Sequence, residues 1–125
     1  MRGQDLESRN WPDFARGLSG ELRNLRGGAP EVMKAFSALA QSALAQGALD
    51  GKTKELIAVA ISVAIRCDDC IAFHVKAAVD HGATREEILE TLGMAIYMGA
   101  GPSAMYASHA LGAYADFAAA KANAA

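Results

Sequence analysis

The sequence predicts an all-α fold, a bundle of five to six helices, from three observations. First, 52% of the 125 residues are apolar and only 6% are aromatic, and the abundant alanine suits closely packed helices better than a strand-rich fold. Second, apolar residues recur at helical intervals without strand-like alternation. Third, the length suffices for one domain that buries its own core. We therefore expect residues 1–125 to form a single domain.

Two helices are predicted in the N-terminal part of the chain. The first covers residues 14–25, FARGLSGELRNL, where apolar residues are helically spaced although two glycines weaken the pattern. GGAP at 27–30 interrupts it, and Pro30 suits the first turn of a second helix over 30–46, because its missing N–H costs nothing there. The second helix carries an apolar stripe formed by Val32, Phe36, Leu39 and Ala43.

The most apolar segment, residues 52–66, is predicted to be the central helix. Beyond Glu55 it is apolar on almost every side, as expected of a helix that is surrounded by protein. Its longest apolar run, LIAVAISVAI, has ten residues, about half of the ~20 residues that a bilayer-spanning helix needs. We therefore expect a buried helix and no membrane partner.

The next helix is predicted to begin within the CDDC segment. Asp68 or Asp69 can cap its N-terminus, and Gly82 can end it. Thr84 and Glu87 then have the spacing of a capping box, in which each residue satisfies a free backbone N–H of the other.

The capping box opens a helix predicted over residues 85–98. GAGP at 99–102 breaks the chain, and a last helix follows over about 103–119. Small residues early in this last helix let it approach a neighbour closely, and that neighbour can belong to another subunit. They are Ser103, Ala104, Ala107 and Ser108.

The charge pattern excludes some classes of partner. The net charge is −2, the calculated pI is about 5.9, and no cluster of Lys or Arg with interleaved aromatics is present, so nucleic acid is not an expected partner. The N-terminal segment MRGQDLESRNWPDF lacks the apolar region of a signal peptide. We expect a cytoplasmic protein.

The stretch IRCDDCIAFH holds both cysteines, Cys67 and Cys70, followed by His74. Cytosolic reductants oppose permanent disulfides, so we expect this pair to serve catalysis or metal binding. A helix N-terminus favours a thiolate, and Cys70 and His74 share a helix face because they are four residues apart. The intervening aspartates have the opposite effect and raise the thiol pKa, unless they point elsewhere.

A CxxC pair supports thiol–disulfide chemistry, because either cysteine can attack a substrate and the other can resolve the product. His74 is within reach to accept a thiol proton. Glu55, the only acid in the central helix, can accept a proton if it lies partly buried beside the thiols.

The segment KELIAVAISVAIRCDDCIAFHVKAAVDHGAT, followed by GMAIYMGAGPSAMYASHAL, resembles the carboxymuconolactone decarboxylase superfamily in its alkylhydroperoxidase D-like branch. The likeness covers a core of about residues 50–117, preceded by a variable N-terminal arm and helix over 1–28. It implies an all-α fold and assembly as a homo-oligomer, a trimer or hexamer. The family pattern E-x(11)-C-x-x-C-x-x-x-H is met by Glu55, Cys67, Cys70 and His74.

By this resemblance the four residues form a proton relay with peroxidase activity. Cys70 attacks a small hydroperoxide, Cys67 resolves it as a disulfide, and His74 and Glu55 manage protons. An external dithiol or disulfide protein supplies electrons, and no cofactor or metal is expected. Alkylhydroperoxidase D has a histidine where this chain has Asp69, so the resemblance does not identify the physiological oxidant and reductant.

Two other functions remain open. One is a decarboxylase or lyase acting on a small lactone acid of the 4-carboxymuconolactone type, with His74 or His109 handling a proton. The decarboxylase members do not rely on CxxC, so its presence argues against this function. The other is an interaction module in which the cysteines bind zinc, although the sequence offers no fourth ligand at a recognisable spacing.

Purely structural roles are also possible for individual residues. The cysteines can be small buried hydrophobes, and Glu55 can simply pair with Lys52 or with a lysine of another helix. His81 fits a helix C-terminus, and His109 more often packs or caps than catalyses. Core or subunit contacts are the expected role of Met94, Tyr97, Met98, Met105 and Tyr106.

Overall fold

A computed structural model describes residues 9–124. Within this range the chain forms five helices and no strand, which confirms the all-α prediction. The helices are α2 (Trp11–Gly28), α3 (Pro30–Leu44), α4 (Gly51–Ala64), α5 (Asp68–Asp80) and α6 (Arg85–Ala124). The first eight residues of the expected N-terminal arm lie outside the described range.

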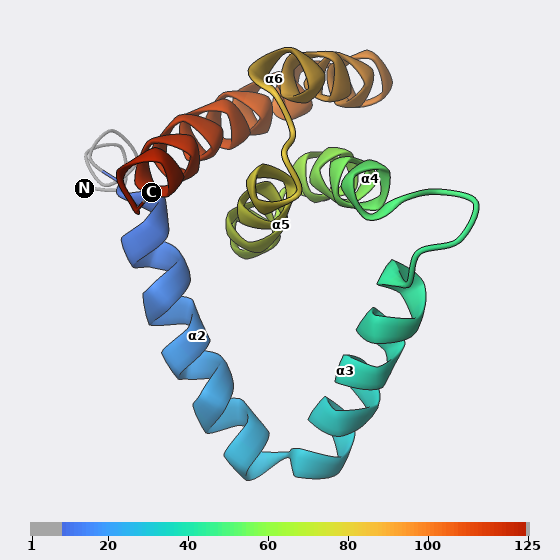
Figure 1. Ribbon diagram of the computed structural model, residues 1–125, viewed down its shortest axis with the longest axis vertical. Helices are drawn as coiled ribbons and strands as arrows, with labels where there is room; N and C mark the ends of the chain where they lie inside the picture. The colour runs from blue at the N-terminus through green and yellow to red at the C-terminus, as the bar shows by residue number, and fades with distance from the viewer. Residues whose placement is uncertain (1–8, 125) are drawn as a thin grey trace.

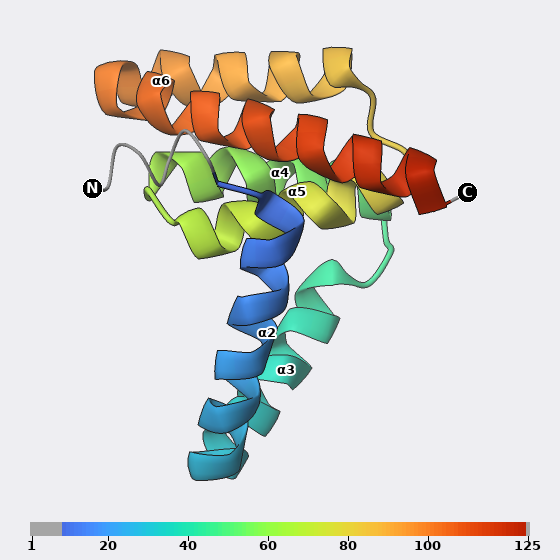
Figure 2. The same ribbon diagram turned by 90° about the vertical axis from the view of Figure 1, so that its left-hand side faces the viewer.

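Helix α6 is a hairpin of two helical segments. Ala100 leaves the helical conformation, with φ 55° and ψ −135°, and Pro102 follows it. Figures 1 and 2 show the two segments running side by side in opposite directions. The break predicted at 99–102 is therefore present. The turn is tight, since a Cβ at Gly99 would collide with the hydroxyl of the buried Ser103.

The core lies where α4, α5 and α6 pack together. The largest fully buried side chains come from these three helices, and they are Val59, Val63, Ile71, Val75 and Ile88. Trp11, at the start of α2, and Phe117, near the end of α6, are also buried in this cluster. Helix α2 is thus joined to the core at its N-terminal end.

Helices α2 and α3 lead away from the other helices and meet at their far ends in a V (Figures 1 and 2). Helix α3 buries none of its residues. The apolar stripe predicted for it exists, but Val32, Phe36 and Leu39 remain 69%, 59% and 63% exposed. Residues 9–124 therefore do not cover this stripe.

The prediction that the central helix is surrounded by protein is wrong on one side. Val59 and Val63 of α4 are fully buried, but Ile57, Ile61 and Ile65 are 44%, 53% and 63% exposed. The reason lies in the path of α3, which diverges from α4 instead of covering this face (Figure 1). The spacing of apolar residues along a helix does not by itself tell which faces of that helix are covered by a neighbouring element.

Helix ends follow local capping signals. Helix α2 starts at Trp11, three residues before the predicted start, because the Asn10 side chain accepts a hydrogen bond from the Asp13 N–H and Pro12 follows in the first turn. It also continues through Gly28, so the break before α3 is Ala29 alone.

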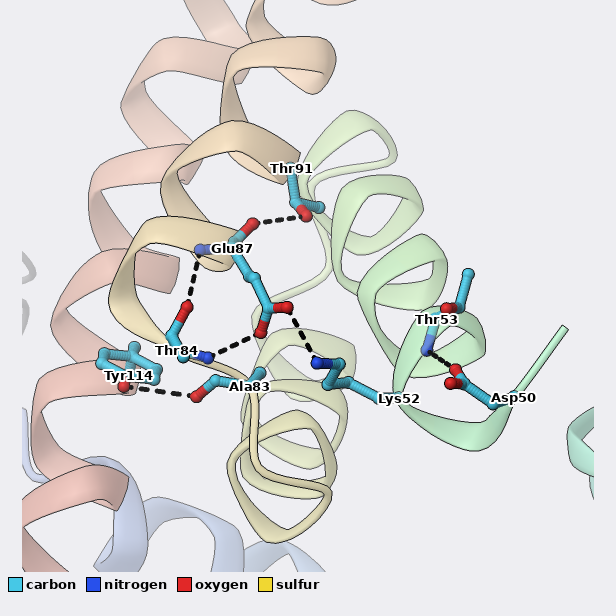
Figure 3. A network of polar contacts seen from close by, with 8 residues as sticks. All are labelled: Asp50, Lys52, Thr53, Ala83, Thr84, Glu87, Thr91 and Tyr114. Atoms are coloured by element: carbon cyan, nitrogen blue, oxygen red, sulfur yellow. Dashed lines mark hydrogen bonds and ion pairs between the residues drawn. The ribbon is translucent and has the colours of Figure 1, made fainter.

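Figure 3 shows the polar network that joins the starts of α4 and α6. The predicted capping box is present: the Glu87 N–H donates to Thr84 Oγ1 (3.1 Å) and the Thr84 N–H donates to Glu87 Oε1 (2.9 Å). The other Glu87 oxygen accepts from Lys52 Nζ at 2.8 Å. This hydrogen bond lowers the pKa of Glu87 and raises the pKa of Lys52. The network fixes the first turn of α4 against α6.

None of the helices in residues 9–124 combines the length and the apolar character that a membrane crossing requires.

Candidate functional site

The turn between α4 and α5 places the two cysteines at the start of α5. Helix α4 ends in a Schellman motif: the Cys67 N–H donates to the Ser62 carbonyl at 3.0 Å and the Arg66 N–H to the Val63 carbonyl at 3.1 Å. Arg66 occupies the left-handed position of this motif, with φ 60°, where glycine is the usual residue. The chain therefore reverses within two residues, and Cys67 directly precedes α5.

Cys67 and Cys70 form a disulfide, with their Cα atoms 5.2 Å apart. Cys67 is also the N-cap of α5, since its Sγ accepts the Cys70 N–H at 3.1 Å. The expectation that Asp68 or Asp69 caps this helix is therefore wrong. Both aspartates lie in the first turn instead, where a negative charge interacts favourably with the helix dipole.

His74 and Glu55 are in direct contact across the α4–α5 interface. His74 Nδ1 lies 2.7 Å from Glu55 Oε1. Glu55 is 5% exposed, so its carboxylate needs such a polar partner. Because a carboxylate only accepts hydrogen bonds, Nδ1 carries the proton, and Nε2 of a neutral imidazole is left as an acceptor.

The structure thus brings all four predicted site residues to one region. Cys70 and His74 lie one turn apart on one face of α5, Cys67 is bonded to Cys70, and Glu55 reaches His74 from α4. The alternative pairing of Glu55 with Lys52 is not found, because Lys52 binds Glu87. The arrangement combines a disulfide-bonded sulfur pair with an imidazole–carboxylate pair.

An open groove of about 430 Å³ adjoins His74. Its walls are mainly apolar side chains of α3 and α4, including Phe36, Leu39, Ile57 and Ile61. Sequence reasoning did not predict this groove. The available signal was the apolar stripe of α3, whose partner the sequence does not identify.

A second polar cluster surrounds Asp68, the residue after Cys67. Its Oδ2 accepts from Arg9 Nη1 at 3.1 Å, and its Oδ1 lies 3.2 Å from His109 Nδ1. The Arg9 guanidinium also stacks over the rings of Trp11 and Phe14, at 4.8 and 4.5 Å from their centroids. Sequence reasoning missed Arg9, which is separated from Asp68 by 59 positions.

The other candidate residues and the possibility of a metal site are considered in turn. His81 caps the end of α5, with Nδ1 2.8 Å from the Ala77 carbonyl, as expected for a helix C-terminus. Within residues 9–124, no three His, Cys, Asp or Glu side chains are grouped to hold a metal ion. Core positions are ruled out for four side chains that are 59–78% exposed: Met94, Tyr97, Met98 and Met105.

Comparisons with known proteins place the chain among proteins of one family. The sequence profile of the carboxymuconolactone decarboxylase family matches residues 30–113. An uncharacterized protein of Cupriavidus necator is 51% identical over 87 residues, which cover 70% of this chain and 76% of that protein. Uncharacterized protein 4 in the cox locus of Paracoccus denitrificans is 47% identical over 77 residues, covering 62% and 69% respectively.

Two solved structures have the same fold. A carboxymuconolactone decarboxylase family protein from Legionella pneumophila superposes with a TM-score of 0.85 at 51% identity, covering 89% of this chain and 99% of that one. A family protein of Thermotoga maritima, regarded as a candidate for a role in antioxidative response, has a TM-score of 0.80 at 31% identity, with coverages of 88% and 94%.

Proposed function

The chain belongs to the carboxymuconolactone decarboxylase family, and from this premise we propose that it is a thiol–disulfide oxidoreductase that reduces hydroperoxides. One observation carries the proposal: a bonded Cys67–Cys70 pair lies one helical turn from an imidazole that is hydrogen-bonded to a buried carboxylate. The candidate antioxidative role of the Thermotoga maritima relative supports the same reaction class.

In the proposed cycle, the Cys70 thiolate attacks the terminal oxygen of the hydroperoxide. The O–O bond breaks, the alcohol leaves after it takes up a proton, and Cys70 becomes a sulfenic acid. The Cys67 thiol then attacks the Cys70 sulfur, water leaves, and the disulfide forms. An external dithiol or dithiol protein returns two electrons and two protons and regenerates both thiols.

His74 and Glu55 provide the proton transfers in this cycle. His74 accepts the Cys70 proton and later returns it to the departing oxygen, which requires an unprotonated Nε2 at the start. Glu55 fixes that tautomer through its contact with Nδ1 and stabilises the imidazolium that forms. No bound cofactor enters the cycle.

The groove beside His74 supports an organic hydroperoxide as the substrate. Apolar walls favour an alkyl or aryl group over water through burial of apolar surface. Only one cationic side chain, Lys54, lines the groove among the described residues. Its Nζ donates to the Ala43 carbonyl at 2.9 Å, so it is already engaged.

The family match also keeps a second candidate in view, a decarboxylase or lyase acting on a small lactone acid. In that reaction His74 or His109 transfers a proton and the cysteines are incidental. A carboxylate substrate favours a site with free cations. The largely apolar groove fits the hydroperoxide better.

We further propose that the protein works in the cytoplasm as a homo-oligomer, a trimer or hexamer.

The test is peroxide consumption with a dithiol reductant, comparing wild type with Cys70→Ser and Cys67→Ser. Cumene hydroperoxide and hydrogen peroxide serve as substrates, and Arg23→Ala on the exposed side of α2 is a control. We expect no turnover in either cysteine variant, and one trapped sulfenic acid per chain in Cys67→Ser. Unchanged rates in both variants would end the proposal. Lactone acid turnover that survives alkylation of both thiols would establish the second candidate.

A further inference from the structure

The sequence places two acidic residues between the thiols, and this creates an electrostatic problem. A carboxylate close to a thiol raises the thiol pKa, whereas the N-terminus of α5 lowers it through its free N–H groups. Asp68 directly follows Cys67, so its negative charge opposes the effect of the helix N-terminus on the thiol pair. Whether the thiols ionise easily depends on how this charge is compensated.

Both oxygens of Asp68 are engaged by groups from other parts of the chain. Arg9, from the segment before α2, binds Oδ2 at 3.1 Å, and His109, from the second half of α6, approaches Oδ1 at 3.2 Å. The side chains of Arg9, Asp68 and His109 are only 10%, 23% and 21% exposed. Solvent therefore screens these contacts less than it screens a surface ion pair.

The position of Arg9 is itself fixed by packing. Its guanidinium stacks on the rings of Trp11 and Phe14. Trp11 is 5% exposed, and its backbone N–H donates to Asp116 Oδ2 at 3.1 Å. The cation is therefore held in place by α2 and α6 rather than carried on a free side chain, so less side-chain entropy is lost when it binds Asp68.

We propose that Arg9 and His109 are positioning residues that compensate the charge of Asp68, so that the N-terminus of α5 can stabilise a thiolate in the Cys67–Cys70 pair. The inference rests on the proposed thiol chemistry and adds how the fold tunes it. Arg9 is a permanent cation and supplies most of the compensation. His109 supplies a hydrogen bond in its neutral form and a charge when protonated.

The other charges near the sulfur pair do not replace this compensation. Arg66, directly before Cys67, is a cation, but it is exposed, so water screens its charge. Glu55 is an anion that is already paired with His74. Asp69 is exposed, so water screens its effect on the thiols. The charged and titratable groups that α4, α5 and the flanking elements bring to this region are Arg9, Glu55, Arg66, Asp68, Asp69, His74, Tyr106 and His109.

The experiment measures the thiols directly and not the peroxidase reaction. Reduced protein is alkylated with iodoacetamide over a range of pH, and mass spectrometry of the peptides gives a titration midpoint for each cysteine. The variants are Arg9→Gln, Arg9→Lys, Asp68→Asn and the double variant Arg9→Gln/Asp68→Asn. Arg16→Gln is the matched control, because Arg16 is an exposed arginine of α2 that pairs with Asp13.

We expect Arg9→Gln to raise the lower of the two midpoints by about 0.5 to 1 pH unit, because the negative charge of Asp68 beside the thiol pair is then uncompensated. Arg9→Lys and Arg16→Gln should leave the midpoint close to wild type. The double variant should return to the wild-type value or below it. Circular dichroism melting shows which variants are folded at the assay temperature.

Two results overturn the inference: no change in Arg9→Gln, or the same increase in the double variant, which reveals a structural effect that does not act through Asp68. If Arg9→Gln is unfolded, His109→Asn carries the test, again with and without Asp68→Asn. The proposed function fails separately. It is contradicted if the wild type does not turn over peroxide even though the thiol midpoints of the variants shift as predicted.

Discussion

Glu55 is the residue whose surroundings bear most directly on chemistry. It is 5% exposed in a helix that is largely apolar after it, and a buried carboxylate persists only when it is paired and hydrogen-bonded. Its partner is His74 on the neighbouring helix. The free energy that this pair costs the fold is consistent with a functional use, since surface residues provide ion pairs with a smaller desolvation cost.

Replacing Glu55 by Gln tests that use. The variant keeps the shape of the side chain but removes the charge that stabilises the His74 imidazolium. We expect kcat/KM for cumene hydroperoxide to fall by about 10- to 100-fold, near or below the lower end of the range for general acid–base catalysis. His74→Ala should have at least as large an effect.

The double variant Glu55→Gln/His74→Ala should be no slower than His74→Ala alone, because the two residues act as one unit. Lys52→Met is a suitable control, since Lys52 lies on the same helix and binds Glu87. Wild-type kinetics in Glu55→Gln would show that the pair is structural.

At the level of single elements, three chain reversals each turn at a residue with a positive φ. The α4–α5 turn has Arg66 at a left-handed position, and the turn after α5 has Gly82 at φ 86°. The α6 hairpin turns at Ala100 and brings Gly99 against Ser103. Two of the four small residues predicted to permit a close approach do so here, inside the chain: Ser103 and Ala107 are 3% and 5% exposed, whereas Ser108 is exposed.

Gly99→Ala should therefore destabilise the hairpin. The added Cβ meets the buried Ser103 side chain, and overpacking of this kind costs about 1–3 kcal/mol. Gly101→Ala is the matched control two positions on, because a Cβ there meets nothing within 4 Å. Urea denaturation of the reduced proteins measures both free energies of unfolding, and equal values would contradict the predicted collision.

The ion pair between the starts of α4 and α6 predicts a pH dependence of stability. The hydrogen bond from Lys52 lowers the pKa of Glu87 below its ordinary value of 4.5. Stability from this group is thus fully present above pH 4.5 and is lost as the pH falls through the lowered value. The pKa of Lys52 is raised above 10.5, so its contribution is lost only as the pH rises through that higher value.

Comparing wild type with Glu87→Gln isolates this contribution, because Gln retains the capping box. The urea concentration at the unfolding midpoint should be higher for wild type than for Glu87→Gln at pH 7, and the two values should converge toward pH 2. Lys52→Met should reproduce the pattern, since it removes the other partner of the same contact. A difference that persists or grows on acidification would contradict the assignment.

For the whole molecule, the main unexplained feature is exposed apolar surface. Large apolar side chains of α3, α4 and α6 remain uncovered, with Tyr97 and Met98 78% and 76% exposed. Contiguous apolar surface on a soluble protein commonly marks an interaction site. These side chains support the expectation that copies of the chain assemble with one another.

Tyr97→Glu should weaken that assembly, because it places a charge in the expected contact. Light scattering coupled to gel filtration should give a trimer or hexamer for wild type and a smaller species for the variant. Arg23→Glu, on the exposed part of α2, should leave the mass unchanged. A monomeric wild type at micromolar concentration would contradict the prediction. Tyr97 is not among the residues that line the groove beside His74, so this variant leaves the groove walls intact.

The sequence by itself determined the helical class and most helix ends, and it predicted Glu55, Cys67, Cys70 and His74 as a site. These features are local: capping boxes, glycine stops and the spacing of Cys70 and His74 each depend on a few neighbouring residues. Even there one assignment failed, since Cys67 rather than an aspartate caps α5.

Only the tertiary structure decided which distant groups meet. It paired Glu55 with His74 instead of Lys52, brought Arg9 and His109 to Asp68, and left one face of α4 open beside α3. Such contacts depend on the angles at which helices pack and on where each chain reversal occurs. Periodicity along the chain gives each helix an apolar face, but it does not specify the neighbour that covers it.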